Sequence, residues 1–189
     1  MASRDEILGA LRRNAPPPAA LPEARTFPFE GDLRERFARS VVEVGGRCVA
    51  VPSLDALPAA LAGIPEYAAA RRIVSLLPGS PALEGDPHDF EDVDFCVLAG
   101  ELGVAENGGV WVTRHGGEQR SVAFLAQHIA VVVRAETLVP TLHEAYQRIR
   151  IVRPGFAMFL SGPSKTADIE QALVIGAHGP RSSTTLLVG

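Results

Sequence analysis

The sequence HIAVVV, residues 128–133, is an almost uninterrupted apolar run. Such a run predicts a strand buried on both faces, as in a parallel sheet that helices cover. The runs RCVAV (47–51), RRIVSLL (71–77), VDFCVLAG (93–100), GVWVTR (109–114), GFAMFL (155–160) and TTLLV (184–188) also predict strands. Helix-like segments separate several of them, at residues 32–46, 53–64, 136–150 and 167–177. This alternation predicts an α/β fold of three layers with a mostly parallel sheet.

The first 30 residues differ from the rest. Ser3 and Glu6 have the spacing of a helix capping box, and apolar residues follow at helical spacing up to Arg12 and Arg13. The next segment, APPPAALPEARTFPFEG, contains five prolines in seventeen residues and cannot continue a helix. We therefore predict an N-terminal helix and proline-rich tether over residues 1–30, followed by one α/β domain over residues 31–189.

Composition excludes several classes of function. The net charge of −4 and the absence of a basic run argue against nucleic acid as a partner. No apolar run approaches the length of about 20 residues that spans a membrane, and the first residues are charged, so we expect a cytoplasmic protein. Cys48 and Cys96 lie apart in apolar runs, and no metal-ligand spacing occurs, so we predict no metal site and no cofactor held by this chain.

The loop SGPSKTADIEQ, residues 161–171, has two interpretations. Ser164 or Thr166 would cap a helix whose first turn contains Asp168 and Glu170. The same loop, after the strand predicted at 155–160, would present N–H groups to an anion at the carboxyl edge of the sheet. The predicted ligand residues of such a site are Gly162, Ser164, Lys165, Thr166 and Asp168 of this loop, together with Gly108 and Gly179 of two other turns. The loop is not a P-loop, because only Gly162 precedes Lys165.

Two further turns contain candidate catalytic residues. Asn107 and Gly108 predict a hairpin with an exposed Glu106, although a carboxylate at a glycine-rich turn also suits a nucleophile or general base. His178 lies in a turn before the last strand, either as a structural residue or facing a cleft together with Gly179. We expect Glu106, His178 and the loop at Ser164 to converge on one cleft.

The string SGPSKTADIEQALVIGAHGP, residues 161–180, resembles the signature of the LUD domain, the family of lactate utilization protein C. GVAENGGVWV (103–112) and LAQHIAVV (125–132) resemble two further strings of that family. The matched positions are Glu106, Gly108, His128, Gly162, Pro163, Ser164, Thr166, Asp168, Glu170, His178 and Gly179.

This resemblance implies a fold similar to that of sugar-phosphate isomerases and CoA-transferases. It also implies a role in oxidising L-lactate to pyruvate with partner proteins, one of which holds the iron–sulfur clusters. The chain would then be an accessory or subunit that binds a small carboxylate or phosphate, and not an independent enzyme.

The sequence departs from the family before His128, where Ala126 and Gln127 replace the usual proline-containing approach. It also departs at one turn, where Asn107 and Gly109 replace two threonines. The resulting AENGG is similar to the string around the catalytic glutamate of CoA-transferases. An alternative function is therefore a CoA-transferase-like enzyme with Glu106 as its nucleophile.

Overall fold

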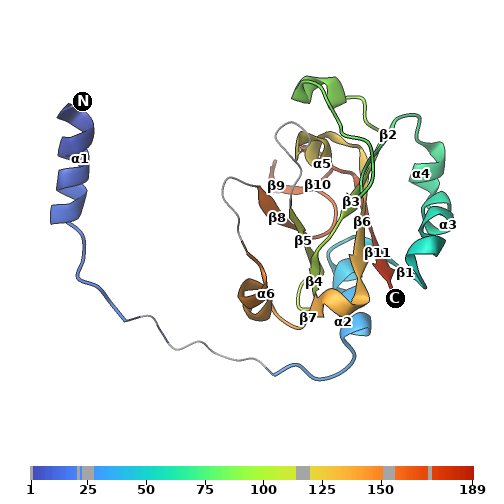
Figure 1. Ribbon diagram of the computed structural model, residues 1–189, viewed down its shortest axis with the longest axis horizontal. Helices are drawn as coiled ribbons and strands as arrows, with labels where there is room; N and C mark the ends of the chain where they lie inside the picture. The colour runs from blue at the N-terminus through green and yellow to red at the C-terminus, as the bar shows by residue number, and fades with distance from the viewer. Residues whose placement is uncertain (1, 21, 23–27, 114–119, 151–155, 170–171) are drawn as a thin grey trace.

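A five-stranded parallel sheet forms the centre of the protein (Figure 1). The structure, a computed structural model, describes residues 2–20, 22, 28–113, 120–150, 156–169 and 172–189. In spatial order, the strands are β1 (Arg47–Val51), β11 (Ser182–Val188), β6 (His128–Arg134), β3 (Phe95–Ala99) and β2 (Ile73–Leu76). Every neighbouring pair is parallel. The predicted α/β class, with a mostly parallel sheet flanked by helices, is confirmed.

One face of this sheet is covered by α3 (Leu57–Ala62) and α4 (Pro65–Ala69), which follow one another along the right of the sheet in Figure 1. Leu57, Leu61 and Ile64 pack against buried side chains of the sheet such as Phe95. A 3₁₀ turn, η1 (Leu54–Ala56), precedes α3, and Ser53 makes no side-chain cap bond. The predicted Ser-capped helix is therefore a 3₁₀ turn followed by a shorter helix.

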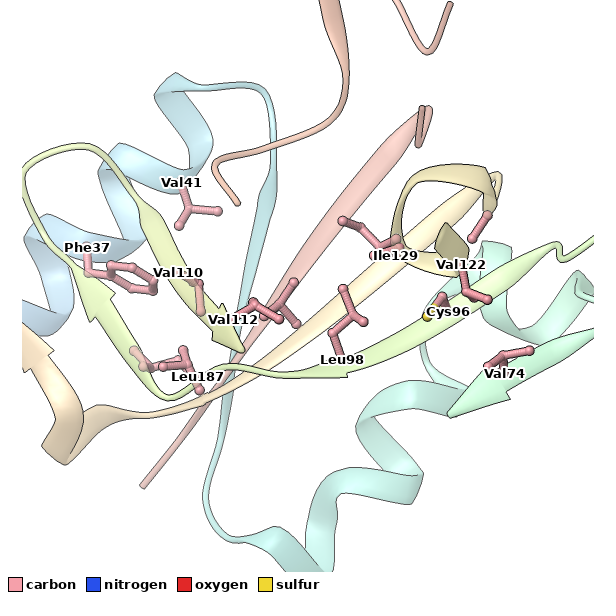
Figure 2. Packing of buried hydrophobic residues seen from close by; sticks show 14 of the residues in the cluster. Phe37, Val41, Val74, Cys96, Leu98, Val110, Val112, Val122, Ile129 and Leu187 are labelled. Carbon is pink, nitrogen blue, oxygen red and sulfur yellow. The ribbon is translucent and has the colours of Figure 1, made fainter. Parts of the chain in front are cut away.

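A second sheet covers the other face of the central sheet. Its spatial order is β7 (Leu138–Val139), β4 (Leu102–Val104), β5 (Gly109–Thr113) and β8 (Ala157–Leu160). With it lie α2 (Leu33–Glu43) and α5 (Val122–Leu125), and η2 (Pro87–Phe90) precedes β3. In Figure 2, Phe37 and Val41 of α2 and Val110 of β5 face a core that includes Ile129 and Leu187 of the central sheet.

Two sequence predictions are wrong at this second sheet. The run at 155–160, expected in the parallel sheet, contains β8, which pairs antiparallel with β5. All four residues of β8 are only half buried, as suits a strand at the edge of the smaller sheet. The helix expected over residues 136–150 is also wrong in its first part, where the chain forms the turn η4 (Ala135–Thr137) and then β7. The helix α6 (Leu142–Arg148) begins only after Pro140 and its N-cap residue Thr141.

The helix predicted after Ser164 is also wrong. Residues 165–175 contain an antiparallel pair, β9 (Lys165–Ile169) and β10 (Ala172–Ile175), in which Lys165 pairs with Ile175. The base of this hairpin is closed by bonds from Ser164 N to the Pro180 carbonyl and from Gly176 N to the Ser164 carbonyl, both 2.9 Å. These long-range bonds outweigh the local capping pattern, so the expected helix N-terminus, with its N–H groups, does not exist.

The predicted opening helix is α1 (Ala2–Arg13), which lies well apart from both sheets in Figure 1. No helix in the described part of the chain is both long enough and apolar enough to cross a membrane. The division into a tether over 1–30 and a domain over 31–189 stays a prediction.

Candidate functional site

The loops singled out in the sequence gather at the amino edge of the central sheet. Pro180 and Arg181 directly precede β11, Gln127 precedes β6, and Gly45 and Gly46 precede β1. The expectation that the loop after residues 155–160 lies at the carboxyl edge is therefore wrong. Because β8 belongs to the second sheet, the chain that leaves it reaches the opposite edge of the central one.

The Glu106 turn is a tight hairpin between β4 and β5. Gly108 has a φ of +66°, and the Asn107 side-chain oxygen accepts the Gly109 N–H at 3.0 Å. Glu106 is exposed, and its carboxylate accepts the Leu142 N–H at 2.9 Å, at the first residue of α6. The hairpin interpretation is confirmed, and the observed partner of Glu106 is a helix terminus, where a carboxylate is stabilising.

The Ser161 loop contacts this hairpin. Ser161 Oγ donates to the Asn107 carbonyl at 2.9 Å. Gly162 has a φ of +71°, and a Cβ added there would lie 2.5 Å from the carbonyl oxygen of Val44, the C-cap of α2. Two segments that are far apart in sequence, at Asn107 and at Gly162, are thus held together at the end of α2.

The loop before β11 packs on the same segment. A Cβ added at Gly179 would lie 3.0 Å from Ser164 Cβ, so Gly179 and Ser164 are in close contact. His178 is exposed in the bend that contains Gly179.

The other predicted ligand residues lie in β9. Lys165 is exposed and Thr166 is half buried, while Asp168 has its backbone in β9. Glu170 is outside the described residues. The assignment of these residues to a ligand stays a prediction, without the helix that suggested it.

A cavity of about 450 Å³ opens beside this cluster, between α4 and the amino edge of the sheet. It has a mixed polar and apolar lining, made by Pro65, Glu66, Ala69, Ala70, Asp94, Gln127, His128 and Arg181. A cavity with a few converging polar groups is the usual form of a small-molecule site. We take it as the candidate functional site.

His128, the first residue of β6, is fixed within this lining. Its Nδ1 lies 2.8 Å from Ser182 Oγ, and its ring stacks on Phe95 with centroids 6.5 Å apart. Burial lowers the pKa of His128; positive charge on Arg181 and Arg47 acts in the same direction, and Glu66 and Asp94 oppose it. The imidazole is therefore neutral at pH 7, with Nε2 as its second hydrogen-bonding atom.

The two carboxylates of the lining are each held by other groups. Glu66 pairs with the Arg47 guanidinium at 2.6 Å, and this hydrogen bond lowers the pKa of Glu66. Asp94 accepts the backbone N–H groups of Arg71 at 2.8 Å and Arg72 at 3.0 Å, and these bonds lower the pKa of Asp94. Both carboxylates stay ionised, and both are engaged in hydrogen bonds.

Arg181 has no such partner: within the described residues, no carboxylate lies within 4 Å of its guanidinium. Its position is nevertheless defined, because Arg181 N donates to the Gln127 carbonyl at 2.8 Å. Its side-chain stem also packs on Gly176, where an added Cβ would lie 2.5 Å from Arg181 Cγ. The cavity lining therefore contains one guanidinium that forms no ion pair with a described carboxylate.

Sequence reasoning missed most of this lining. Arg181, Glu66 and Asp94 were not predicted, and His128 was marked only through the family resemblance. The sequence contains only a weak indication of these four residues, which is that each lies at or next to the start of a strand or helix. The parallel register of the strands is what brings them to one edge of the sheet. In the described residues, no group of three or more His, Cys, Asp or Glu side chains could hold a metal ion.

This fold and this cavity define an α/β domain with a polar site at the amino edge of a parallel sheet. Among solved structures, the crystal structure of a DUF162 family protein from Deinococcus radiodurans is similar, with a TM-score of 0.58 and 20% identity over 83% of this chain and 96% of that one. The chain belongs to the LUD domain family, whose model matches residues 82–188.

Curated relatives carry a functional name. The chain is 33% identical over 103 residues to lactate utilization protein C from Shouchella clausii, which covers 52% of this chain and 45% of that protein. It is 34% identical over 104 residues to the protein of the same name from Bacillus pumilus, covering 52% of this chain and 43% of that one. The match thus spans less than half the length of these relatives.

Proposed function

We propose that this chain is a component of an L-lactate utilization system that oxidises L-lactate to pyruvate, and that it acts with iron–sulfur partner proteins and binds a small anionic ligand. The observation that carries the proposal is the LUD domain match, together with relatives named lactate utilization protein C. The uncompensated guanidinium of Arg181 in the cavity supports an anion as the ligand.

The cysteine content supports a role alongside partners. Oxidation of a 2-hydroxy acid to a 2-oxo acid releases two electrons, which an acceptor has to receive. The chain has two cysteines, fewer than the four that ligate an iron–sulfur cluster in Cys₄ sites. The clusters of the system would therefore belong to the partners. Cys48 and Cys96 are both free thiols, which suits the reducing cytoplasm as the site of action.

The CoA-transferase alternative rests on the AENGG string alone, and no contact among the described residues adds to it. A nucleophilic carboxylate has to be available to the acyl group, whereas the Glu106 carboxylate accepts the Leu142 N–H at the start of α6. We therefore interpret Glu106 as a residue that joins the β4–β5 hairpin to α6.

The test is to purify the chain alone, its iron–sulfur partners alone, and the mixture, and to measure lactate-dependent reduction of an artificial electron acceptor dye. We expect dye reduction by the mixture at a rate well above the sum of the separate preparations. Rapid dye reduction by this chain alone would contradict the accessory role, and no gain on mixing would contradict the partnership.

A further inference from the structure

The charge balance of the cavity favours a singly charged anion. Arg181 contributes a guanidinium that forms no ion pair with a described carboxylate, and guanidinium groups bind carboxylates through paired hydrogen bonds. Glu66 and Asp94 remain negative in the same lining, so a dianion such as phosphate experiences more repulsion than a monoanion. The site is therefore better suited to a monocarboxylate than to phosphate.

A second polar group is fixed next to this guanidinium. His128 Nδ1 is engaged with Ser182 Oγ, and the ring stacks on Phe95, so the orientation of the imidazole is defined from two sides. Nε2 is then the ring nitrogen left for a ligand in the cavity, and a neutral imidazole can exchange a hydrogen bond with a hydroxyl group.

We propose that this cavity binds a small 2-hydroxycarboxylate, with the carboxylate on the Arg181 guanidinium and the hydroxyl on His128 Nε2. The binding of a carboxylate follows from the site alone, whereas the choice of a 2-hydroxy acid also rests on the proposed function. A cavity of about 450 Å³ is larger than a three-carbon acid requires, so the ligand occupies only the part next to His128 and Arg181.

The experiment is calorimetric titration of the full chain with L-lactate, with propionate, which lacks the hydroxyl, and with inorganic phosphate. We expect lactate to bind more tightly than propionate, and propionate more tightly than phosphate. Arg181→Gln should weaken lactate binding by about tenfold or more, because it removes charged hydrogen bonds. Arg39→Gln is the matched control, since it makes the same change of charge on the exposed surface of α2 and should leave binding unchanged.

Two further variants separate the parts of the site. His128→Phe keeps the ring stacked on Phe95 but removes both nitrogens, so it should weaken lactate by about two- to tenfold and leave propionate unchanged. Gly176→Ala keeps every charge but displaces the stem of Arg181, so it should weaken both acids. Thermal melting of each variant confirms that it is folded.

Equal lactate affinity in Arg181→Gln and Arg39→Gln would overturn the site, as would an absence of lactate binding to the unaltered chain. Phosphate binding as tightly as lactate would overturn the monocarboxylate assignment. The proposed function fails separately: Arg181-dependent lactate binding without dye reduction by the mixture supports the site and contradicts the function. Dye reduction that is unaffected by Arg181→Gln, with unaltered lactate affinity, supports the function and contradicts the site.

Discussion

Replacement of Gly108 by alanine tests whether the Glu106 hairpin is locked against α2. Gly108 has a φ of +66°, and a Cβ added there would lie 2.7 Å from Val41 N and 2.9 Å from the carbonyl carbon of Ser40. These are backbone atoms of a helix whose Phe37 and Val41 are buried in the core, so they cannot move aside without disturbing it. Figure 2 shows Phe37 and Val41 on this helix beside Val110 of β5.

The expected loss in free energy of unfolding follows from a comparison with the same substitution at Gly79. That glycine has a φ of +87° but no atom within 4 Å of an added Cβ, so Gly79→Ala incurs only the conformational cost of about 1–2 kcal/mol. Gly108→Ala incurs the same conformational cost and in addition an overpacking cost of about 1–3 kcal/mol. The difference between the two variants in free energy of unfolding should therefore be about 1–3 kcal/mol.

The assay is urea unfolding of both variants and the unaltered chain, followed by the fluorescence of Trp111, which is 6% exposed. In thermal melts, each 1 kcal/mol corresponds to a shift of about 2–4 °C for a chain of this length. Equal destabilisation by the two alanines would refute the reasoning, because the hairpin could then move away from α2. The contact between Asn107 and Ser161 would in that case not fix the position of the loop.

Four further predictions concern single groups. Lys165→Ala should change the free energy of unfolding by less than about 0.5 kcal/mol in urea titrations, because Lys165 is exposed on β9 and not at a helix N-terminus. Hydroxylamine with acyl-CoA should leave Glu106 unmodified by mass spectrometry; a hydroxamate there would restore the transferase alternative. Because the pKa of His128 is lower in the folded state, the unfolded state binds more protons between the two pKa values. Stability should therefore fall as the pH is lowered through about 6.5, and less so in His128→Phe. Burial raises the pKa of Cys48 to about 11 and that of Cys96 to about 12, so a thiol reagent at pH 7 should label the folded chain slowly and the urea-unfolded chain rapidly.

The central sheet could be predicted because its strands are buried on both sides. In β6, Ile129, Val131 and Val133 pack toward the second sheet, while Ala130 and Val132 pack toward α3 and α4. A strand in that environment needs apolar residues at every position, and this requirement is visible in the sequence without any knowledge of its neighbours.

The second sheet could not be predicted in the same way. β4 has three residues and β7 has two, which is too short to show a period, and β7 lies inside a segment with helical spacing. The β9–β10 hairpin was missed for a different reason. SGPSKTADIEQ is a valid capping sequence, but the bonds of Ser164 with Pro180 and Gly176 are made to residues that local patterns do not consider.

The same long-range contacts explain why the string VIGAHGPR, residues 174–181, has glycines and a proline next to the candidate site. Gly176 has a φ of +74° and packs on the stem of Arg181, Gly179 touches Ser164, and the Pro180 carbonyl accepts the Ser164 N–H. Each of these features fixes the chain just before β11 and so determines where Arg181 enters the cavity. His178, a candidate catalytic residue of this string, is exposed in the bend, and its role stays a prediction. The glycines of the string are thus explained by close packing, and its chemical contribution to the cavity comes from the arginine that follows it.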